Sequence, residues 1–199
     1  MQKTIPNEST ETVAETRIKM TAFLLICVML PSSFMPEATV VKWLIFNSII
    51  LIFILVIQFV VWQKYKNDTV KYYSLQVYIM LMGIVFYAIV PFLKLLSGTI
   101  YFWIIGLATI VFIIAAHVLN KRTTLSFVNK NHKNLIKIAS IYVGILILAG
   151  IVLIGMMQTK EAPENAGVSI LFYLVGILFI VLAPMFLLMK TEVNRLTKS

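Results

Sequence analysis

Charged residues are scarce in this chain. Asp, Glu, Lys and Arg make up 13% of its 199 residues, whereas hydrophobic residues make up 60%. Ordinary soluble domains carry about 25% charged and about 45–50% apolar residues. A soluble fold of this length cannot bury so much apolar surface. The composition therefore excludes an ordinary soluble domain and indicates a chain that folds in a lipid bilayer.

Residues that carry catalysis and metal binding are also few. The only cysteine, Cys27, lies in an apolar run and is interpreted as a small hydrophobic residue, since no CxxC pair or disulfide framework is possible. His117 and His132 are far apart, and no HExxH, Walker or GxSxG motif is present. The sequence thus predicts no catalytic residue, no metal and no cofactor, and we expect a protein that is not an enzyme.

Long apolar runs are what the chain does have. A helix needs about 20 apolar residues to cross the hydrocarbon core of a bilayer. The runs predict an all-α, polytopic membrane protein with a six-span bundle. A transmembrane domain at 20–189 follows a polar tail at 1–19 and precedes a basic tail at 190–199. The predicted spans are 20–35, 39–62, 72–93, 100–118, 138–157 and 168–189.

The first span differs from the others. It has 16 residues, so as a helix it covers only about 24 Å of a core about 30 Å thick, and Pro31, Ser32 and Ser33 interrupt it. We predict a short, kinked span, with a half-inserted or interfacial helix as the alternative. A capping box from Thr12 to Glu15 predicts that this helix begins near Thr12.

Polar residues inside the spans are the candidates for contacts between helices. Asn47, Gln58 and Gln76 need hydrogen-bond partners in hydrocarbon and are expected to face other helices, or to line a path if the protein is a permease. Lys42 and Lys94 lie at the ends of spans, where we expect their amines to reach water. Ser140 and Gly144 form a small-xxx-small pair that predicts close helix packing.

The distribution of basic residues predicts the orientation. The loop 120–137 has no acid, and with six spans 14 of the 17 basic residues share one side of the membrane. The positive-inside rule then places both termini in the cytoplasm. The abundance of Lys, Ile and Asn suggests a bacterial plasma membrane. The basic residues of this loop are Lys121, Arg122, Lys130, Lys133 and Lys137.

This loop admits three roles. Its apolar residues recur at helical spacing, so a helix lying in the headgroup region and binding anionic lipid is one prediction. A purely topological role and the docking of an acidic cytoplasmic partner are the others. Nucleic acid is not expected as a partner, because the basic residues lie in short segments between spans and form no separate domain.

Two spans share a pattern. In the third span Gly83 precedes Pro91, and in the sixth span Gly176 precedes Pro184 at the same spacing. The residues around the two pairs are also similar. In a six-span topology these spans run in opposite directions, as an inverted repeat requires. The alternative is that the similarity arose by chance, because both spans are built from a small set of apolar residue types.

Three functions remain open after these observations. The first is a non-enzymatic protein that acts by helix contacts with other membrane proteins or by self-association, as an accessory subunit of a secretion or export system or as an immunity-type protein. The second is a small permease or channel subunit. The third, an intramembrane enzyme, is the least supported, because no span carries an ionisable residue in its middle third.

Overall fold

The computed structural model describes residues 8–35, 40–66, 68–121, 123–124, 140, 144 and 165–187, with side chains from Arg17 onwards. Within these ranges every element is a helix, and five helices are long and apolar enough to cross a membrane. The predicted all-helical fold is therefore confirmed for the described residues, and their long apolar helices are compatible with a membrane protein. The fifth predicted span lies almost entirely outside the described residues. The elements are α1 (Glu8–Phe34), α2 (Val40–Tyr65), α3 (Thr69–Leu95), α4 (Ile100–Val118), α7 (Ala166–Leu182) and the 3₁₀ helix η1 (Ala183–Leu187).

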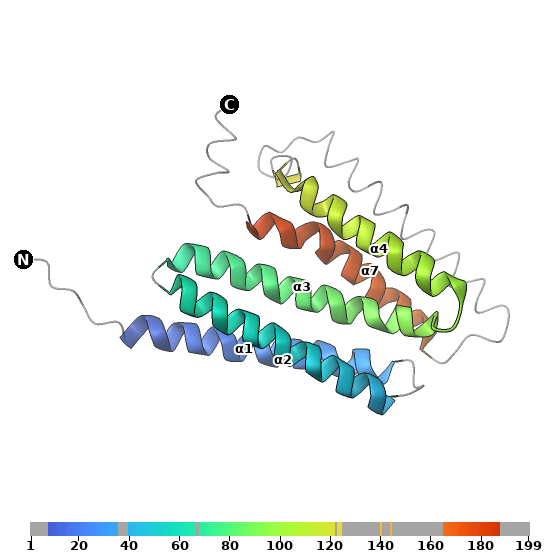
Figure 1. Ribbon diagram of the computed structural model, residues 1–199, viewed down its shortest axis with the longest axis horizontal. Helices are drawn as coiled ribbons and strands as arrows, with labels where there is room; N and C mark the ends of the chain where they lie inside the picture. Colours follow the sequence, from blue (N-terminus) through green and yellow to red (C-terminus); the bar gives the residue numbers. More distant parts are fainter. Residues whose placement is uncertain are drawn as a thin grey trace, which may run out of the picture.

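The helices lie along a common axis (Figure 1). Contacts between α1 and α3 join Thr21 to Gln76 and Ser33 to Lys94, so these two helices are parallel. The remaining helices, α2, α4 and α7, run the other way (Figure 1). From α1 to α4 the direction alternates, as short connections between consecutive spans require, whereas α4 and α7 run the same way.

The first span differs from its prediction. α1 has 27 residues and begins at Glu8, four residues before the predicted start, and it continues through Pro31 to Phe34. Its apolar part, Arg17–Phe34, has 18 residues. Proline lacks the N–H that would bond the fourth preceding carbonyl. Pro31 therefore leaves the carbonyl of Cys27 without this donor, and the nearby Oγ of Ser33 donates to a different carbonyl, that of Met29, at 2.9 Å.

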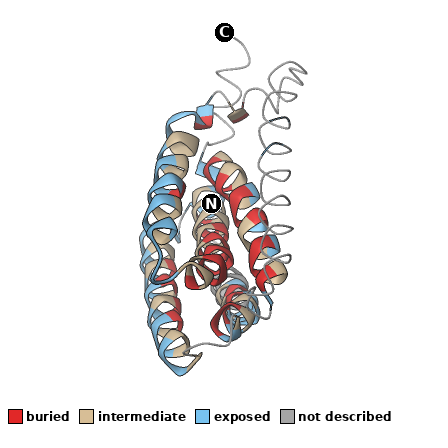
Figure 2. Cartoon of the chain, turned by 90° about the vertical axis from the view of Figure 1, so that its right-hand side faces the viewer, coloured by how far each residue is buried: buried red, intermediate tan, exposed pale blue. Residues whose placement is uncertain are grey.

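α3 is the central helix of the described bundle. It packs against α1, α2 and α7, and 61% of its span is buried, against 17% for α2. Asp68 caps its start by accepting a hydrogen bond from the backbone N–H of Lys71 at 3.1 Å. Figure 2 shows buried residues on the inward sides of the helices and exposed residues on the outward sides. The capped start explains why α3 begins before the predicted residue 72.

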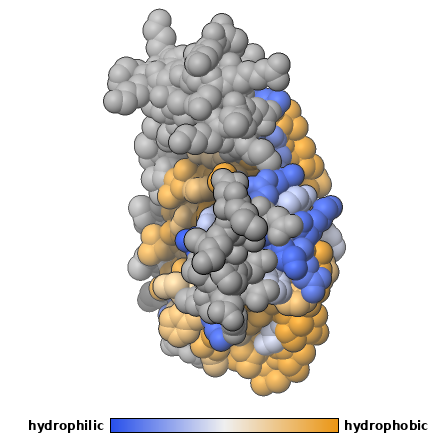
Figure 3. Space-filling view, turned by 90° about the vertical axis from the view of Figure 1, so that its left-hand side faces the viewer, coloured by the Kyte–Doolittle hydropathy of each residue, from blue (hydrophilic) through white to orange (hydrophobic). Residues whose placement is uncertain are grey.

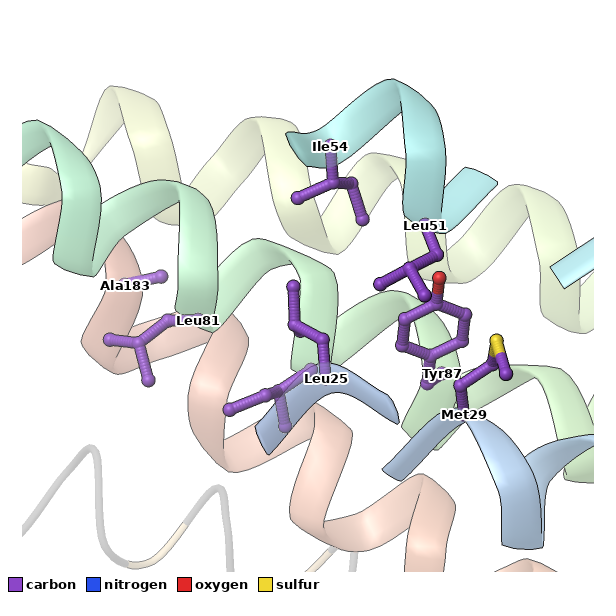
Figure 4. Packing of buried hydrophobic residues seen from close by; sticks show 8 residues of the cluster. Leu25, Met29, Leu51, Ile54, Leu81, Tyr87 and Ala183 are labelled. Carbon is purple, nitrogen blue, oxygen red and sulfur yellow. The ribbon is translucent and has the colours of Figure 1, made fainter. Parts of the chain in front are cut away.

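α2 contributes a single stripe to the interior. Its buried residues are Asn47, Leu51, Ile54 and Gln58, which recur at spacings of four, three and four. This spacing places them on one face of an α-helix. The central part of the stripe packs into an apolar cluster shared with α1, α3 and η1 (Figure 4). The buried members of the cluster are Leu25, Met29, Leu51, Ile54, Leu81, Ile84, Tyr87 and Ala183.

Two glycines lie at tight contacts. A Cβ atom at Gly83 would lie 2.9 Å from Leu25 Cδ2, and one at Gly176 would lie 3.2 Å from Ala88 Cβ. Gly83 thus faces α1, whereas Gly176 faces α3. The prolines of the two patterns also differ, because α3 continues through Pro91 whereas Pro184 lies in η1. The inverted repeat remains a prediction, and the described contacts are not symmetric.

The two ends of the bundle differ in charge. The end where α2 finishes and α3 begins carries Lys64, Lys66 and Lys71, and Arg17 lies there with its guanidinium 3.7 Å from the Tyr73 ring centroid. Figure 3 looks at this end and shows hydrophilic residues gathered beside hydrophobic surface. The opposite end carries Lys42 and the buried Lys94.

Candidate functional site

Lys94 is buried at the end of α3. Only 5% of its surface is exposed, and its Nζ donates a hydrogen bond to the carbonyl oxygen of Ser33 at 2.8 Å. The expectation that this amine reaches water is therefore wrong. The last turn of α1 lies beside the end of α3, so a carbonyl of that turn is within hydrogen-bond distance of the amine. Intramembrane basic residues that are kept from water are candidates for function.

Three helices meet around this lysine. The side-chain amide of Asn47 on α2 donates to Ser33 Oγ at 2.8 Å. The hydroxyl of Tyr87 on α3 donates to the backbone carbonyl of Asn47 at 3.0 Å. The Trp43 ring centroid lies 5.6 Å from Lys94 Nζ, within the range of a cation–π contact. We call Ser33, Trp43, Asn47, Tyr87 and Lys94 the Lys94 cluster.

The chemistry of the Lys94 cluster is electrostatic. The last carbonyls of a helix lack intrahelical partners and carry partial negative charge, which a lysine at this position stabilises. Lys94 thereby ties the end of α1 to α3, while Asn47 ties it to α2. Two oxygens in the same region, Asn47 Oδ1 and Ser32 Oγ, are buried without a hydrogen-bond partner. No carboxylate from the described residues contacts the ammonium group.

A second polar layer lies toward the opposite end of the same three helices. Gln76 Nε2 donates to Thr21 Oγ1 at 3.4 Å, joining α3 to α1. Gln58 on α2 is 1% exposed, and neither of its side-chain polar atoms has a partner. Because α2 is antiparallel to both neighbours, the register set by the Asn47 contacts places Gln58 at the level of Thr21 and Gln76.

The two polar layers are not continuous with each other. Leu51 and Ile54 separate Asn47 from Gln58 on α2, and Leu25 and Leu81 fill the same level on α1 and α3. Asn47, Gln58 and Gln76 are all buried, so in this structure they face neighbouring helices of the same chain. Asn47 and Gln76 each donate a hydrogen bond to a residue of α1, whereas the polar atoms of the Gln58 side chain have no partner. The three residues form no continuous polar path along the described helices.

α4 is held to the bundle by polar contacts. His117 Nδ1 lies 2.8 Å from the carbonyl of Ile113, which can only accept, so this nitrogen carries a proton. In the neutral ring Nε2 then accepts from the Tyr78 hydroxyl, at 2.8 Å. Farther along, Thr109 Oγ1 and the Tyr173 hydroxyl are 3.0 Å apart. These contacts join α4 to α3 and α7.

Asn120 adds a contact from the beginning of the predicted basic loop. Its side-chain amide donates to the Pro184 carbonyl at 2.6 Å and its Oδ1 accepts from Thr124. Lys121 is exposed. Arg122, Lys130, Lys133 and Lys137 lie outside the described residues.

The predicted small-residue pair is described only at its two positions. Ser140 and Gly144 are both exposed, and a Cβ atom at Gly144 would meet nothing within 4 Å. Among the described residues, no group of three or more His, Cys, Asp or Glu side chains could hold a metal ion.

The sequence does not predict the contacts of Ser33 and Tyr87 or the burial of Lys94. Ser33 is expected there only as a helix interruption, and the one signal for Lys94 is its position between apolar neighbours. Comparison with protein-family models, with curated proteins and with solved structures finds no match to this chain.

Proposed function

We propose that this chain is a non-enzymatic multi-pass membrane protein that acts through helix contacts with other membrane proteins, either as an accessory subunit of a secretion or export system or as an immunity-type protein. The observation that carries the proposal is the position of α4. Only 6% of this helix is buried, against 61% of α3. Polar bonds from Thr109 and His117 nevertheless hold it in a defined place. Because α4 contributes so few buried residues to the core of this chain, most of its surface is available for contact with a partner protein.

One side of α4 has the spacing of a helix-packing surface. Its members follow one another by three, four, three and seven residues, all are exposed, and the spacing places them on one helix face. Ala108 near its centre is small enough to allow another helix to approach closely. We call this set the α4 outer stripe: Tyr101, Ile104, Ala108, Val111 and Val118.

The proposal includes six spans. α4 and α7 are parallel, since Thr109 contacts Tyr173 and Asn120 contacts Pro184. A chain that leaves one helix and enters a parallel one must cross the bilayer an odd number of times between them. One crossing at 138–157 is the simplest solution, and it supports the predicted total of six.

The proposal also places both termini in the cytoplasm of a bacterial cell. The grouping of Lys64, Lys66 and Lys71 at one end of the bundle supports it through the positive-inside rule. Single cysteines at Gln63 and Ser97, which are exposed at opposite ends, test it in a Cys27→Ser background. An impermeant maleimide is expected to label Ser97→Cys in intact cells and Gln63→Cys only after permeabilisation. The reverse pattern contradicts the orientation.

Purification in a mild detergent tests the function. We expect a membrane protein to co-purify with the chain, and Ala108→Trp in the α4 outer stripe to reduce its yield. Ile52→Trp, on the exposed side of α2, is the matched control and should leave the yield unchanged. A wild-type chain that emerges alone and monodisperse contradicts the proposal.

A further inference from the structure

α3 and α4 enclose an apolar groove of about 540 Å³. It is lined by residues between 82 and 93 of α3 and between 102 and 113 of α4. Its volume falls in the range of about 300–1,000 Å³ that is typical of sites for small ligands. The groove is separate from the Lys94 cluster, because Lys94 faces α1 and does not line it.

Two side chains in the lining carry a polar group, Trp103 at the end beside the α3–α4 turn and Thr109. The hydroxyl of Thr109 donates to the Ile105 carbonyl at 2.7 Å. Its oxygen then accepts from the Tyr173 hydroxyl. Since both the proton and an oxygen lone pair of Thr109 are used, the site favours a hydrocarbon occupant.

The length of the groove matches the thickness of the hydrocarbon region of one leaflet, which is half of the bilayer core. Residues 82–93 of an α-helix rise about 16 Å, and the hydrocarbon core of a bilayer is about 30 Å thick. The groove begins near Leu93 and Trp103, beside the α3–α4 turn, and extends to Met82 at the middle of α3 and to Ile113 on α4. Trp103 is 72% exposed, and indole rings favour the level of the lipid headgroups.

Gly106 makes the groove deep. A Cβ atom at this position would meet nothing within 4 Å, so the missing side chain leaves open space between the helices. A single acyl chain is far slimmer than a helix about 10 Å across, and it can therefore lie between α3 and α4.

We propose that the α3–α4 groove binds one acyl chain of a phospholipid from the leaflet at the α3–α4 turn. The site is independent of the proposed protein contact, because no residue of the α4 outer stripe lines the groove. Bound lipid fills the space between α3 and α4 and complements the polar bonds from Tyr78 and Tyr173.

Photolabelling in nanodiscs tests this site. The full chain is reconstituted with a phospholipid that carries a diazirine on its acyl chain, and adducts are located by mass spectrometry. We expect saturable adducts at Ile89, Gly106 and Ile110 that excess unlabelled phospholipid displaces. Gly106→Leu should lower them about tenfold, which corresponds to about 1.4 kcal/mol. Gly144→Leu, the same change at another open glycine, should leave them unchanged.

Two results overturn the proposal. Adducts that spread equally over the groove and the exposed side of α2, without saturation, indicate ordinary surrounding lipid. Protein cross-links in place of lipid adducts indicate a protein occupant. If Gly106→Leu fails to fold, Ile110→Trp fills the same groove from a residue that is 56% exposed and must give the same loss of adducts.

Discussion

The Nζ of Lys94 lies 2.8 Å from the carbonyl oxygen of Ser33, so a basic residue of α3 binds the last turn of α1. Helix carbonyls at this position have no backbone partner and favour a cation. The contact joins segments 61 residues apart in sequence and holds the proline-containing end of α1 against the central helix. Lys94 thus forms an electrostatic link between α1 and α3.

Lys94→Met is expected to loosen the end of α1. It leaves the buried Ser33 carbonyl without its side-chain donor, a loss of about 1–3 kcal/mol. Amide hydrogen exchange at residues 29–35 should accelerate, measured in detergent micelles by mass spectrometry. Lys42→Met removes an exposed lysine at the same end and serves as the control. Equal exchange in both variants contradicts the role of Lys94.

Ser33 and Asn47 are expected to be energetically coupled. Asn47 Nδ2 donates to Ser33 Oγ, and both residues are 0% exposed. A double-mutant cycle with Ser33→Ala and Asn47→Leu should give a coupling energy between about 0.6 kcal/mol, the average for hydrogen bonds between membrane helices, and about 1.7 kcal/mol, the maximum. Equilibrium unfolding in mixed micelles provides the four free energies of unfolding. Strict additivity would show that this hydrogen bond does not stabilise the fold.

Gln58→Leu is expected to leave stability unchanged or to raise it by up to about 1–3 kcal/mol. The reason is that both polar atoms of the Gln58 side chain are buried without a partner, and leucine removes that cost. Thermal unfolding in detergent measures the change. Gln76→Leu, which loses a hydrogen bond to Thr21, should be less favourable. A clear loss of stability from Gln58→Leu would reveal a polar partner for this amide.

Alanine substitutions at three glycines are expected to change the stability of the fold by different amounts. Gly176→Ala should destabilise most, because the new Cβ would lie 3.2 Å from Ala88 Cβ, an atom fixed to the backbone of α3. Gly83→Ala should cost less, since the closest atoms belong to the ends of the Leu25 and Ile54 side chains. Gly106→Ala has open space and should gain about 0.5–1 kcal/mol from helix propensity. A different order in thermal unfolding would contradict the packing described.

Four predicted spans, 39–62, 72–93, 100–118 and 168–189, agree closely with described helices, because bilayer thickness fixes the length of a span. The prediction for residues 100–118 coincides with α4, and the facing of Asn47 and Gln58 follows from their helical spacing. The Lys94 cluster could not be predicted in this way. Its formation depends on the register between α1, α2 and α3, and single-helix rules favour water as the partner for a terminal lysine. The carbonyl of Ser33 became that partner because two helix ends meet.

The most direct test of the proposed function is photo-crosslinking in native membranes. A photoreactive amino acid replaces Val111 in the α4 outer stripe or, as the control, Ile52 on the exposed side of α2. The proposed function predicts a discrete adduct with another membrane protein from position 111 and none from position 52. Lipid adducts alone at both positions, with no protein adduct, would contradict it.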